Sequence, residues 1–197
     1  MAIVVEHNKR KHEILQKSLD VFIDEGYEDA TFQKIADRCG ITRTTLYIYF
    51  KNKHEIFLGS IKELLSGIES KILEILNDKD LSTVDALRKV CSTIILECQG
   101  NKKLFNVLLA YLLQLKKSGI DPNERVRRRV IKMRHVLSTL MIRGIKNGEF
   151  TNSNVKDMNE LLYGLIETSI FRLSVLNQDE TSEIVRTLNL AIDGFCK

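Results

Sequence analysis

The 197-residue sequence contains a single proline, Pro122, and no stretch in which Val, Ile and Thr alternate with polar residues. It therefore offers no candidate β-strands, whereas apolar residues recur at three- and four-residue spacing along most of its length. The four cysteines include no C-x-x-C pair, and Cys91 and Cys98 would lie about 10 Å apart along a helix, too far for a disulfide. We expect an all-α protein whose reduced thiols pack as small apolar groups.

Long apolar runs and catalytic motifs are also missing. The longest nearly apolar run, Val107–Leu113, is far shorter than the roughly 20 residues that span a bilayer, and Glu6 interrupts the apolar N-terminus before a signal-peptide core is formed. We expect a cytoplasmic protein with no membrane partner. No histidines stand at zinc-ligand spacing, and no G-x-S-x-G motif or phosphate-binding glycine loop is present. The sequence thus predicts no metal, no cofactor and no enzyme.

Capping side chains and glycines divide the chain into nine expected helices, as is typical of a folded chain with 44% hydrophobic and 28% charged residues. The capping residues are Thr31, Thr42 and the capping-box pair Asn52 and Glu55, and the glycines that end helices are Gly26 and Gly40. The first four helices end at Gly26, Gly40, about Phe50 and about Leu76, and the later ones span about 82–99, 102–117, 122–147, 155–177 and 181–195.

Residues 31–55 form the most informative pattern: a short helix, a glycine turn, a second short helix and the cap of a long helix. This order predicts a helix-turn-helix unit, in which the second short helix presents one face to a DNA groove. That outer face carries Arg43, Thr44, Thr45, Tyr47 and Tyr49. All charged residues from Arg38 to His54 are basic, which favours contact with DNA phosphates, and Arg43 is the best candidate for reading guanine. Taken singly, however, a helix-glycine-helix turn, a basic face or two packed tyrosines also occur without DNA binding.

The stretch from Phe32 to Phe57 closely resembles the N-terminal DNA-binding motif of TetR-family transcriptional regulators. The resemblance extends upstream through 14–30, and the segment 144–150 is similar to one that precedes the last two helices of that family. It implies a helix-turn-helix DNA-binding domain over 1–54, joined by the long fourth helix to a helical ligand-binding and dimerisation domain over 55–197. It also implies a homodimer that binds a near-palindromic operator in double-stranded DNA, usually as a repressor, until a small molecule enters the C-terminal core.

The resemblance also implies roles for individual residues. Thr31 and Gln33 would touch the DNA backbone, the run from Thr42 to Thr45 would approach base edges and phosphates, and three further side chains would hold phosphates. The full set of expected DNA-binding residues is Thr31, Gln33, Thr42, Arg43, Thr44, Thr45, Tyr47, Tyr49 and Lys53. The chain departs from the family pattern in having Lys51-Asn52 before the fourth helix and Ile48 between the two tyrosines.

The C-terminal half offers weaker candidates for a ligand pocket and a dimer interface. Apolar residues of the expected helices either line a pocket for a small apolar or amphipathic effector of unknown identity or simply form the core. The pocket candidates are Phe105, Leu109, Tyr111, Met133, Leu137, Met141 and Phe171. The expected helix 155–177 is apolar on more than one face, so together with the last helix it can pack both on its own core and on a second copy. The candidate residues for the dimer interface are Leu161, Leu165, Leu176, Leu188 and Ile192.

A basic cluster spans residues 125–134 on the seventh expected helix. A solvated face explains the cluster, because apolar residues occupy the opposite side of that helix, but an anionic ligand or an acidic partner would also suit it. The cluster therefore keeps a second function open beside the effector-controlled repressor. In that alternative the chain is an adaptor or structural protein that uses DNA or a protein partner without effector control.

Overall fold

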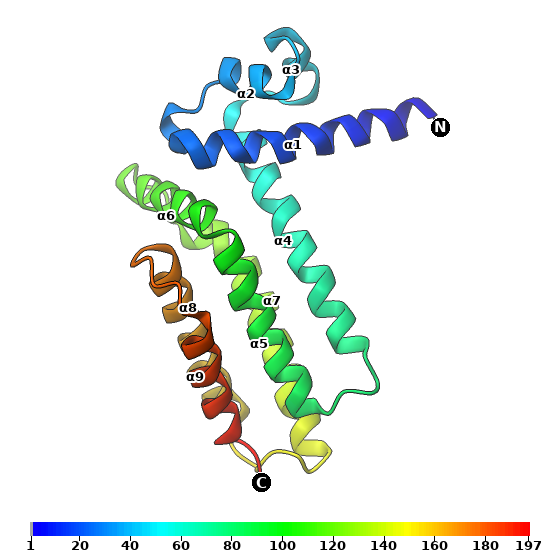
Figure 1. The fold of residues 1–197 in the computed structure, drawn as a ribbon, viewed down its shortest axis with the longest axis vertical. Coiled ribbons are helices and arrows are strands. Elements are labelled where there is room, and N and C mark those ends of the chain that lie inside the picture. The colour runs from blue at the N-terminus through cyan, green and yellow to red at the C-terminus, as the bar shows by residue number, and fades with distance from the viewer. Residues whose placement is uncertain (1) are drawn as a thin grey trace. The chain divides into compact units, whose positions relative to one another are not determined.

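The computed structural model describes the backbone of residues 2–197 and the side chains of residues 6–124 and 126–197 (Figure 1). Within this range the chain forms nine helices and no strand, which confirms the all-α prediction. The helices are α1 (Ala2–Asp29), α2 (Phe32–Cys39), α3 (Arg43–Tyr49), α4 (Lys53–Asn77), α5 (Thr83–Gly100), α6 (Lys102–Lys117), α7 (Asn123–Lys146), α8 (Val155–Ser174) and α9 (Thr181–Asp193). None of the described helices is both long and apolar enough to cross a bilayer.

The chain divides into two compact units. The first unit runs to Glu69 and also takes in Val107–Tyr111 of α6, and the second comprises Ser70–Asn106 and Leu112–Lys197. The expected boundary after residue 54 therefore marks the start of α4 and not the end of the first unit. The first half of α4 belongs to the first core, because Phe57 is fully buried there and the Ser60 hydroxyl donates to the Leu15 carbonyl at 2.8 Å.

The first unit is built on α1, which packs against α2. Gly26 breaks the regular path of α1 because it adopts a positive φ of 78°, a conformation that residues with a Cβ resist. Phe22, Ile35, Leu46 and Phe57 are fully buried, so all four helices contribute to one apolar core. This core fixes α3 with one face inward and the other exposed.

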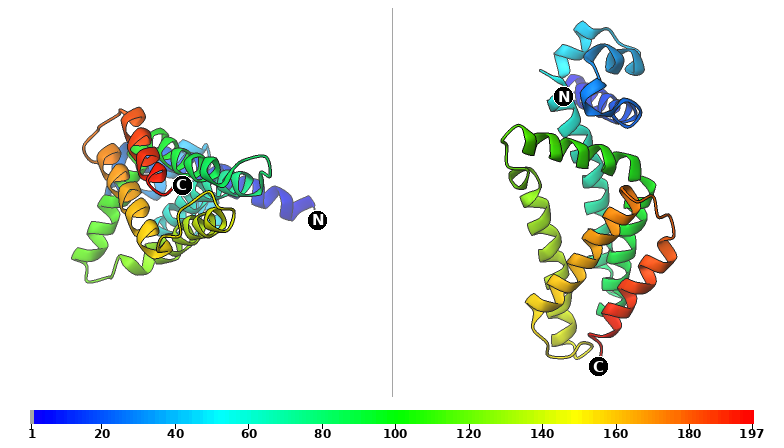
Figure 2. Two further views of the ribbon diagram at one scale, coloured as in Figure 1. Left: turned by 90° about the horizontal axis from the view of Figure 1, so that it is seen from below. Right: turned by 90° about the vertical axis from the view of Figure 1, so that its left-hand side faces the viewer.

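The second unit is a helical bundle in which α5 packs against α7, α8 and α9, and α8 also packs against α7 and α9 (Figure 2). Leu137 and Met141, two of the pocket candidates, are fully buried on α7. Leu188 and Ile192 on α9 are also buried within the chain. Their expected place on a dimer surface is therefore wrong, because the apolar stripe that they form faces α5 and α8.

The segment between α7 and α8 packs tightly on the last turns of α7. Phe150 is fully buried against the last turns of α7, where Gly144 leaves room for its ring. A Cβ at residue 144 would lie only 2.2 Å from the Phe150 ring. Backbone hydrogen bonds then tie the segment after Phe150 to the end of the chain, including Thr151 N–H to the Phe195 carbonyl at 2.8 Å.

All four cysteines are free, as expected. Cys39, Cys91 and Cys98 are buried, and burial raises the pKa of the Cys91 thiol to about 12. A thiol with such a pKa stays protonated and packs as a small apolar group.

Candidate nucleic-acid interface

The two short helices are held by the caps that the sequence predicts. The Thr31 hydroxyl accepts a hydrogen bond from Lys34 N–H at 3.2 Å, and the Thr42 hydroxyl accepts one from Thr45 N–H at 3.0 Å. Between them, Gly40 adopts the left-handed conformation with a φ of 68°. Because these caps satisfy backbone donors locally, the turn between α2 and α3 is fixed by its own sequence.

A capping box starts α4. The Asn52 side-chain oxygen accepts from Glu55 N–H at 2.9 Å, and the Glu55 carboxylate accepts from Lys51 N–H at 2.8 Å. The carboxylate thus reaches one residue further back than in the usual motif, to the residue before the cap. Two residues of the short connection 50–52 between α3 and α4, Lys51 and Asn52, are therefore held by this box.

The outer face of α3 presents Arg43 on an aromatic support. The Tyr47 ring stacks on Phe32 with centroids 4.5 Å apart, and the Arg43 guanidinium lies 5.7 Å from the centroid of the Tyr47 ring. Arg43 also donates to the Tyr47 hydroxyl at 3.2 Å. Arg43 and Thr44 are exposed, so this stack holds a guanidinium at the start of α3 where it is free to meet a base edge.

Two other expected contact residues are less free than Arg43. Thr45 is half-buried, and its hydroxyl lies 2.8 Å from that of Thr42. Tyr49 is half-buried as well, and its ring stacks on His7 of α1 with centroids 4.7 Å apart. Ile48 is 70% exposed between the two tyrosines and adds an apolar spot to the face.

Lys53 occupies a different place from the one expected of a phosphate ligand. Its ammonium donates to the Tyr27 and Glu28 carbonyls at the end of α1, both at 2.8 Å, and lies 4.8 Å from the centroid of the Tyr27 ring. Cations are favourable at a helix C-terminus, where carbonyls lack helical partners. Lys53 therefore ties the start of α4 to the end of α1.

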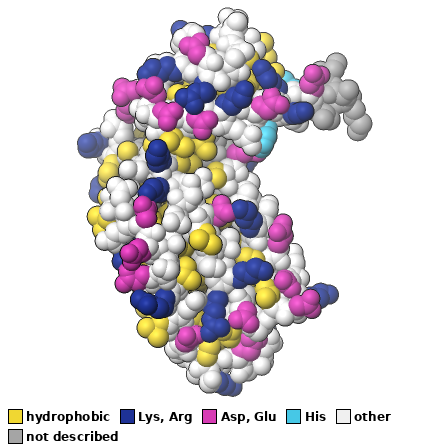
Figure 3. All heavy atoms as spheres, viewed as in Figure 1, with side chains coloured by type: hydrophobic (Ala, Val, Ile, Leu, Met, Phe, Trp, Pro, Cys, Tyr) yellow, Lys and Arg dark blue, Asp and Glu magenta, His cyan; other side chains and the backbone are white. Residues whose placement is uncertain are grey.

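Part of the positive charge expected around α3 is neutralised by ion pairs in the structure. Arg38 forms ion pairs with Asp24 at 2.9 Å and Asp20 at 3.7 Å, and Lys34 pairs with Glu25 at 2.6 Å. Residues 1–59 carry nine basic and nine acidic residues. On the face that Figure 3 shows, basic and acidic side chains are likewise interspersed. Local geometry at Arg43, and not a net charge of this region, is what suits DNA.

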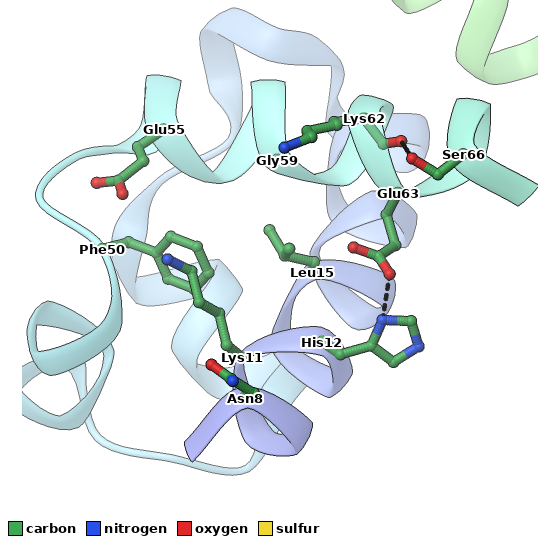
Figure 4. Close-up of a pocket in the computed structure, with 10 residues that line it drawn as sticks. All are labelled: Asn8, Lys11, His12, Leu15, Phe50, Glu55, Gly59, Lys62, Glu63 and Ser66. Carbon is green, nitrogen blue, oxygen red and sulfur yellow. Dashed lines mark hydrogen bonds and ion pairs between the residues drawn. The ribbon is translucent and has the colours of Figure 1, made fainter. Parts of the chain in front are cut away.

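A cleft of about 410 Å³ lies between α1 and α4 (Figure 4). Leu15, Phe50 and Gly59 form its apolar lining, and the Lys11 ammonium lies 5.0 Å from the centroid of the Phe50 ring. At its rim the His12 imidazole is hydrogen-bonded to the Glu63 carboxylate. The sequence gives no indication of this cleft, because its two walls are about fifty residues apart in the chain.

Tyr111, a pocket candidate, instead belongs to the first unit. The centroid of its ring lies 4.8 Å from that of Tyr27 and 4.9 Å from that of Phe57, and its hydroxyl oxygen is 3.2 Å from His54 Nδ1. The pocket candidates are thus divided between the two units, because Phe105, Met133 and Phe171 belong to the second. Phe171 is also half-exposed, whereas Leu137 and Met141 are core.

We expect a Lys53→Met variant to lower the unfolding free energy of the first unit by about 1–3 kcal/mol, because two charge-assisted hydrogen bonds at the end of α1 are lost. Urea denaturation followed by far-ultraviolet circular dichroism measures the change. The matched control is Lys51→Met, which alters an exposed lysine two residues away. Equal stability of the two variants would show that Lys53 does not hold α1.

Comparisons with known proteins agree with this geometry. Residues 14–59 match the family model described as bacterial regulatory proteins, tetR family. The chain is 23% identical to the fatty acid metabolism regulator protein of Bacillus subtilis (strain 168) over 159 residues, 80% of each chain. It is 27% identical to the nucleoid occlusion factor SlmA of Vibrio atlanticus (strain LGP32) over 171 residues, 84% of each chain.

Solved structures share the fold. A TetR transcription regulator from Haloarcula marismortui ATCC 43049 aligns with a TM-score of 0.85 at 21% identity, over 96% of this chain and 100% of that one. The transcriptional regulator FadR from Bacillus subtilis in complex with stearoyl-CoA aligns with a TM-score of 0.70 at 22% identity, over 92% and 95% of the two chains.

The capped α2–α3 pair, the family match over the same residues and the shared fold point to one conclusion. Residues 14–59 match the tetR family of bacterial regulatory proteins, and the chain as a whole has the fold of solved TetR-family regulators.

Proposed function

We propose that the chain is a homodimeric repressor that binds an inverted repeat through α3 and leaves it when a small amphipathic molecule binds the second unit. The observation that carries the DNA-binding part is the Arg43 guanidinium held over Tyr47 on the exposed face of α3. A planar donor in this position suits the two acceptors of guanine in the major groove. In a two-fold dimer, the two α3 helices would reach half-sites about 34 Å apart.

A long-chain acyl-CoA is the effector class that we propose. The support is the similarity to the fatty acid metabolism regulator and to FadR, whose structure contains stearoyl-CoA. An effector of this kind opposes DNA binding only if it binds the DNA-free state more tightly than the DNA-bound state. Stearoyl-CoA and operator DNA should therefore compete for the protein without sharing a site.

The test begins with selection of genomic fragments by the purified protein at about 150 mM salt, followed by titration of the selected fragment against random DNA. We expect an inverted repeat bound about a thousandfold more tightly than random sequence, and at least about fivefold weaker binding when stearoyl-CoA is added. Acetyl-CoA is the matched control for the acyl chain. Sequence-blind binding that is lost at modest salt would contradict the regulator, and an unchanged operator affinity would contradict the effector class.

Dimerisation is proposed to use exposed apolar side chains of α8, of the segment just after it and of α9. Leu161 and Leu176 are each 52% exposed, and Leu165 is half-buried on the same face of α8 as Leu161. Leu190, which sequence reasoning missed, is 71% exposed on α9. Large aliphatic side chains at this exposure suit an isologous contact with a second copy.

We expect a Leu161→Glu/Leu190→Glu double variant to sediment as a monomer at concentrations where the wild type is a dimer, because both charges would be buried without partners. The control is Leu73→Glu, which places a charge at a 57% exposed leucine of α4 outside this surface. A double variant that sediments like the wild-type dimer would exclude this interface.

The second candidate is an adaptor that uses DNA as a location and recruits a protein partner without effector control. The similarity to nucleoid occlusion factors over most of both chains favours it. The two candidates differ in one measurable property. A repressor loses its operator when the effector binds, whereas an adaptor holds DNA and its partner together.

A further inference from the structure

Basic residues outnumber acidic ones most strongly along α6 and α7, which belong to the second unit except for Val107–Tyr111 of α6. Residues 102–146, from α6 to the end of α7, contain twelve Lys and Arg but only two acidic residues, Asp121 and Glu124. The remainder of the chain has 18 basic and 24 acidic residues. The overall formal charge of +4 is therefore the sum of a strongly positive segment and an otherwise acidic protein.

Much of this charge is not neutralised within the chain. Arg127 and Arg128 on α7 are exposed, and neither forms an ion pair with a described carboxylate. Lys116 and Lys117 are exposed in the last turn of α6. Further along α7 the situation differs, because Arg134 pairs with Glu160 at 2.6 Å. Four exposed cations, Lys116, Lys117, Arg127 and Arg128, thus stand close to the turn that joins α6 to α7.

Exposed aliphatic side chains stand among these cations. Leu113 on α6 is 62% exposed, Ile120 in the turn 40% and Ile131 on α7 55%. Ile131 lies one turn beyond Arg127 and Arg128, so it shares their face of α7. We call residues 113–132 the basic corner, and Figure 2 shows the turn between α6 and α7 at the outer edge of the second unit in both views. Arg125 belongs to this segment, but its side chain lies outside the described residues.

We propose that the basic corner binds the surface of an anionic lipid bilayer. Lys and Arg near such a surface each contribute attraction, and neighbouring aliphatic side chains insert between the headgroups. This combination fits a bilayer better than DNA, because DNA backbones are bound by cations and hydrogen-bond donors and gain little from exposed Leu and Ile. The expectation of no membrane partner rested on the missing spanning segment, and surface binding requires none.

The test is flotation of the full chain with vesicles of phosphatidylcholine alone or with about 30% phosphatidylglycerol, at about 150 mM salt. We expect binding to the anionic vesicles only. Arg127→Glu/Arg128→Glu should weaken it by at least about tenfold, since two attractive charges become repulsive. Ile131→Asn, which keeps every charge, should weaken it severalfold because the inserted side chain becomes polar.

The control is Lys79→Glu/Lys89→Glu, which changes the net charge equally at two exposed lysines outside the corner. The proposal is overturned if anionic vesicles are not bound, if the control loses as much binding as the corner variant, or if Ile131→Asn has no effect. Arginine-dependent binding of a polyglutamate peptide without vesicle binding would also overturn it and indicate a protein partner. Operator binding by the corner variant, measured in parallel, should stay at the wild-type level, which separates this proposal from the DNA-binding one.

Discussion

Gly144→Ala is expected to lower the unfolding free energy of the second unit by about 1–3 kcal/mol, the usual cost of forcing extra volume into a packed core. The new methyl group would lie 2.2 Å from one carbon of the Phe150 ring and 2.5 Å from another. The Phe150 ring is fully buried, so it cannot move away from the new methyl group without displacing its neighbours. The higher helix propensity of alanine offsets only about 1 kcal/mol of this cost.

A matched glycine makes the experiment specific. Gly67 lies within α4, and no atom stands within 4 Å of the position that a Cβ would take. Gly67→Ala should therefore stabilise the protein by about 0.5–1 kcal/mol through helix propensity alone. Thermal denaturation followed by circular dichroism compares the two, and Phe150→Leu should restore part of the loss in the Gly144→Ala background. A Gly144→Ala variant as stable as Gly67→Ala would mean that Phe150 does not pack on α7.

The second large effect is expected for Arg43→Ala in DNA binding. If Arg43 reads a guanine, its loss should cost about 1–3 kcal/mol of affinity for the selected operator and much less for random DNA. Titration of both DNAs over a range of salt concentrations measures the two losses separately. Equal losses on both DNAs would show that Arg43 contacts only the backbone.

Two further variants separate charge from geometry at this position. Arg43→Lys keeps the positive charge but loses the planar fork, so it should retain the salt dependence and lose most of the sequence preference. Tyr47→Phe keeps the stack on Phe32 but removes the hydroxyl to which Arg43 donates at 3.2 Å. Its loss of affinity should be smaller than that of Arg43→Ala, because the ring still supports the guanidinium.

The sequence predicted the helices and their caps well because these depend on residues a few positions apart. Thr42 caps α3 through the amide of Thr45, three residues on, and Asn52 caps α4 through Glu55 in the same way. The predicted range 102–117 coincides with α6. Periodicity and capping chemistry are visible within a window of one helix, so each could be recognised before any tertiary contact was known.

Features that depend on distant contacts could not be predicted in this way. Lys53 binds carbonyls 25 and 26 residues earlier, and nothing in its neighbours distinguishes it from a phosphate ligand. Leu188 and Ile192 are buried on the apolar face of α9, as the periodicity indicates. The periodicity alone, however, does not determine whether this face packs on the same chain or on a second copy. Tyr111 stands in an apolar run whose sequence does not reveal that it joins the aromatic cluster of the first unit.

The distribution of tyrosines makes the intrinsic fluorescence of the protein a probe of its first unit. The chain has five tyrosines and no tryptophan, so its near-ultraviolet emission comes from tyrosine alone. Tyr27, Tyr47, Tyr49 and Tyr111 belong to the first unit, and Tyr163 is the remaining one. Emission from the unlabelled protein therefore comes mainly from the unit that carries α3. In a Tyr163→Phe variant all of the tyrosine emission comes from the first unit, so a change in it when a ligand binds the second unit would show that the first unit has responded.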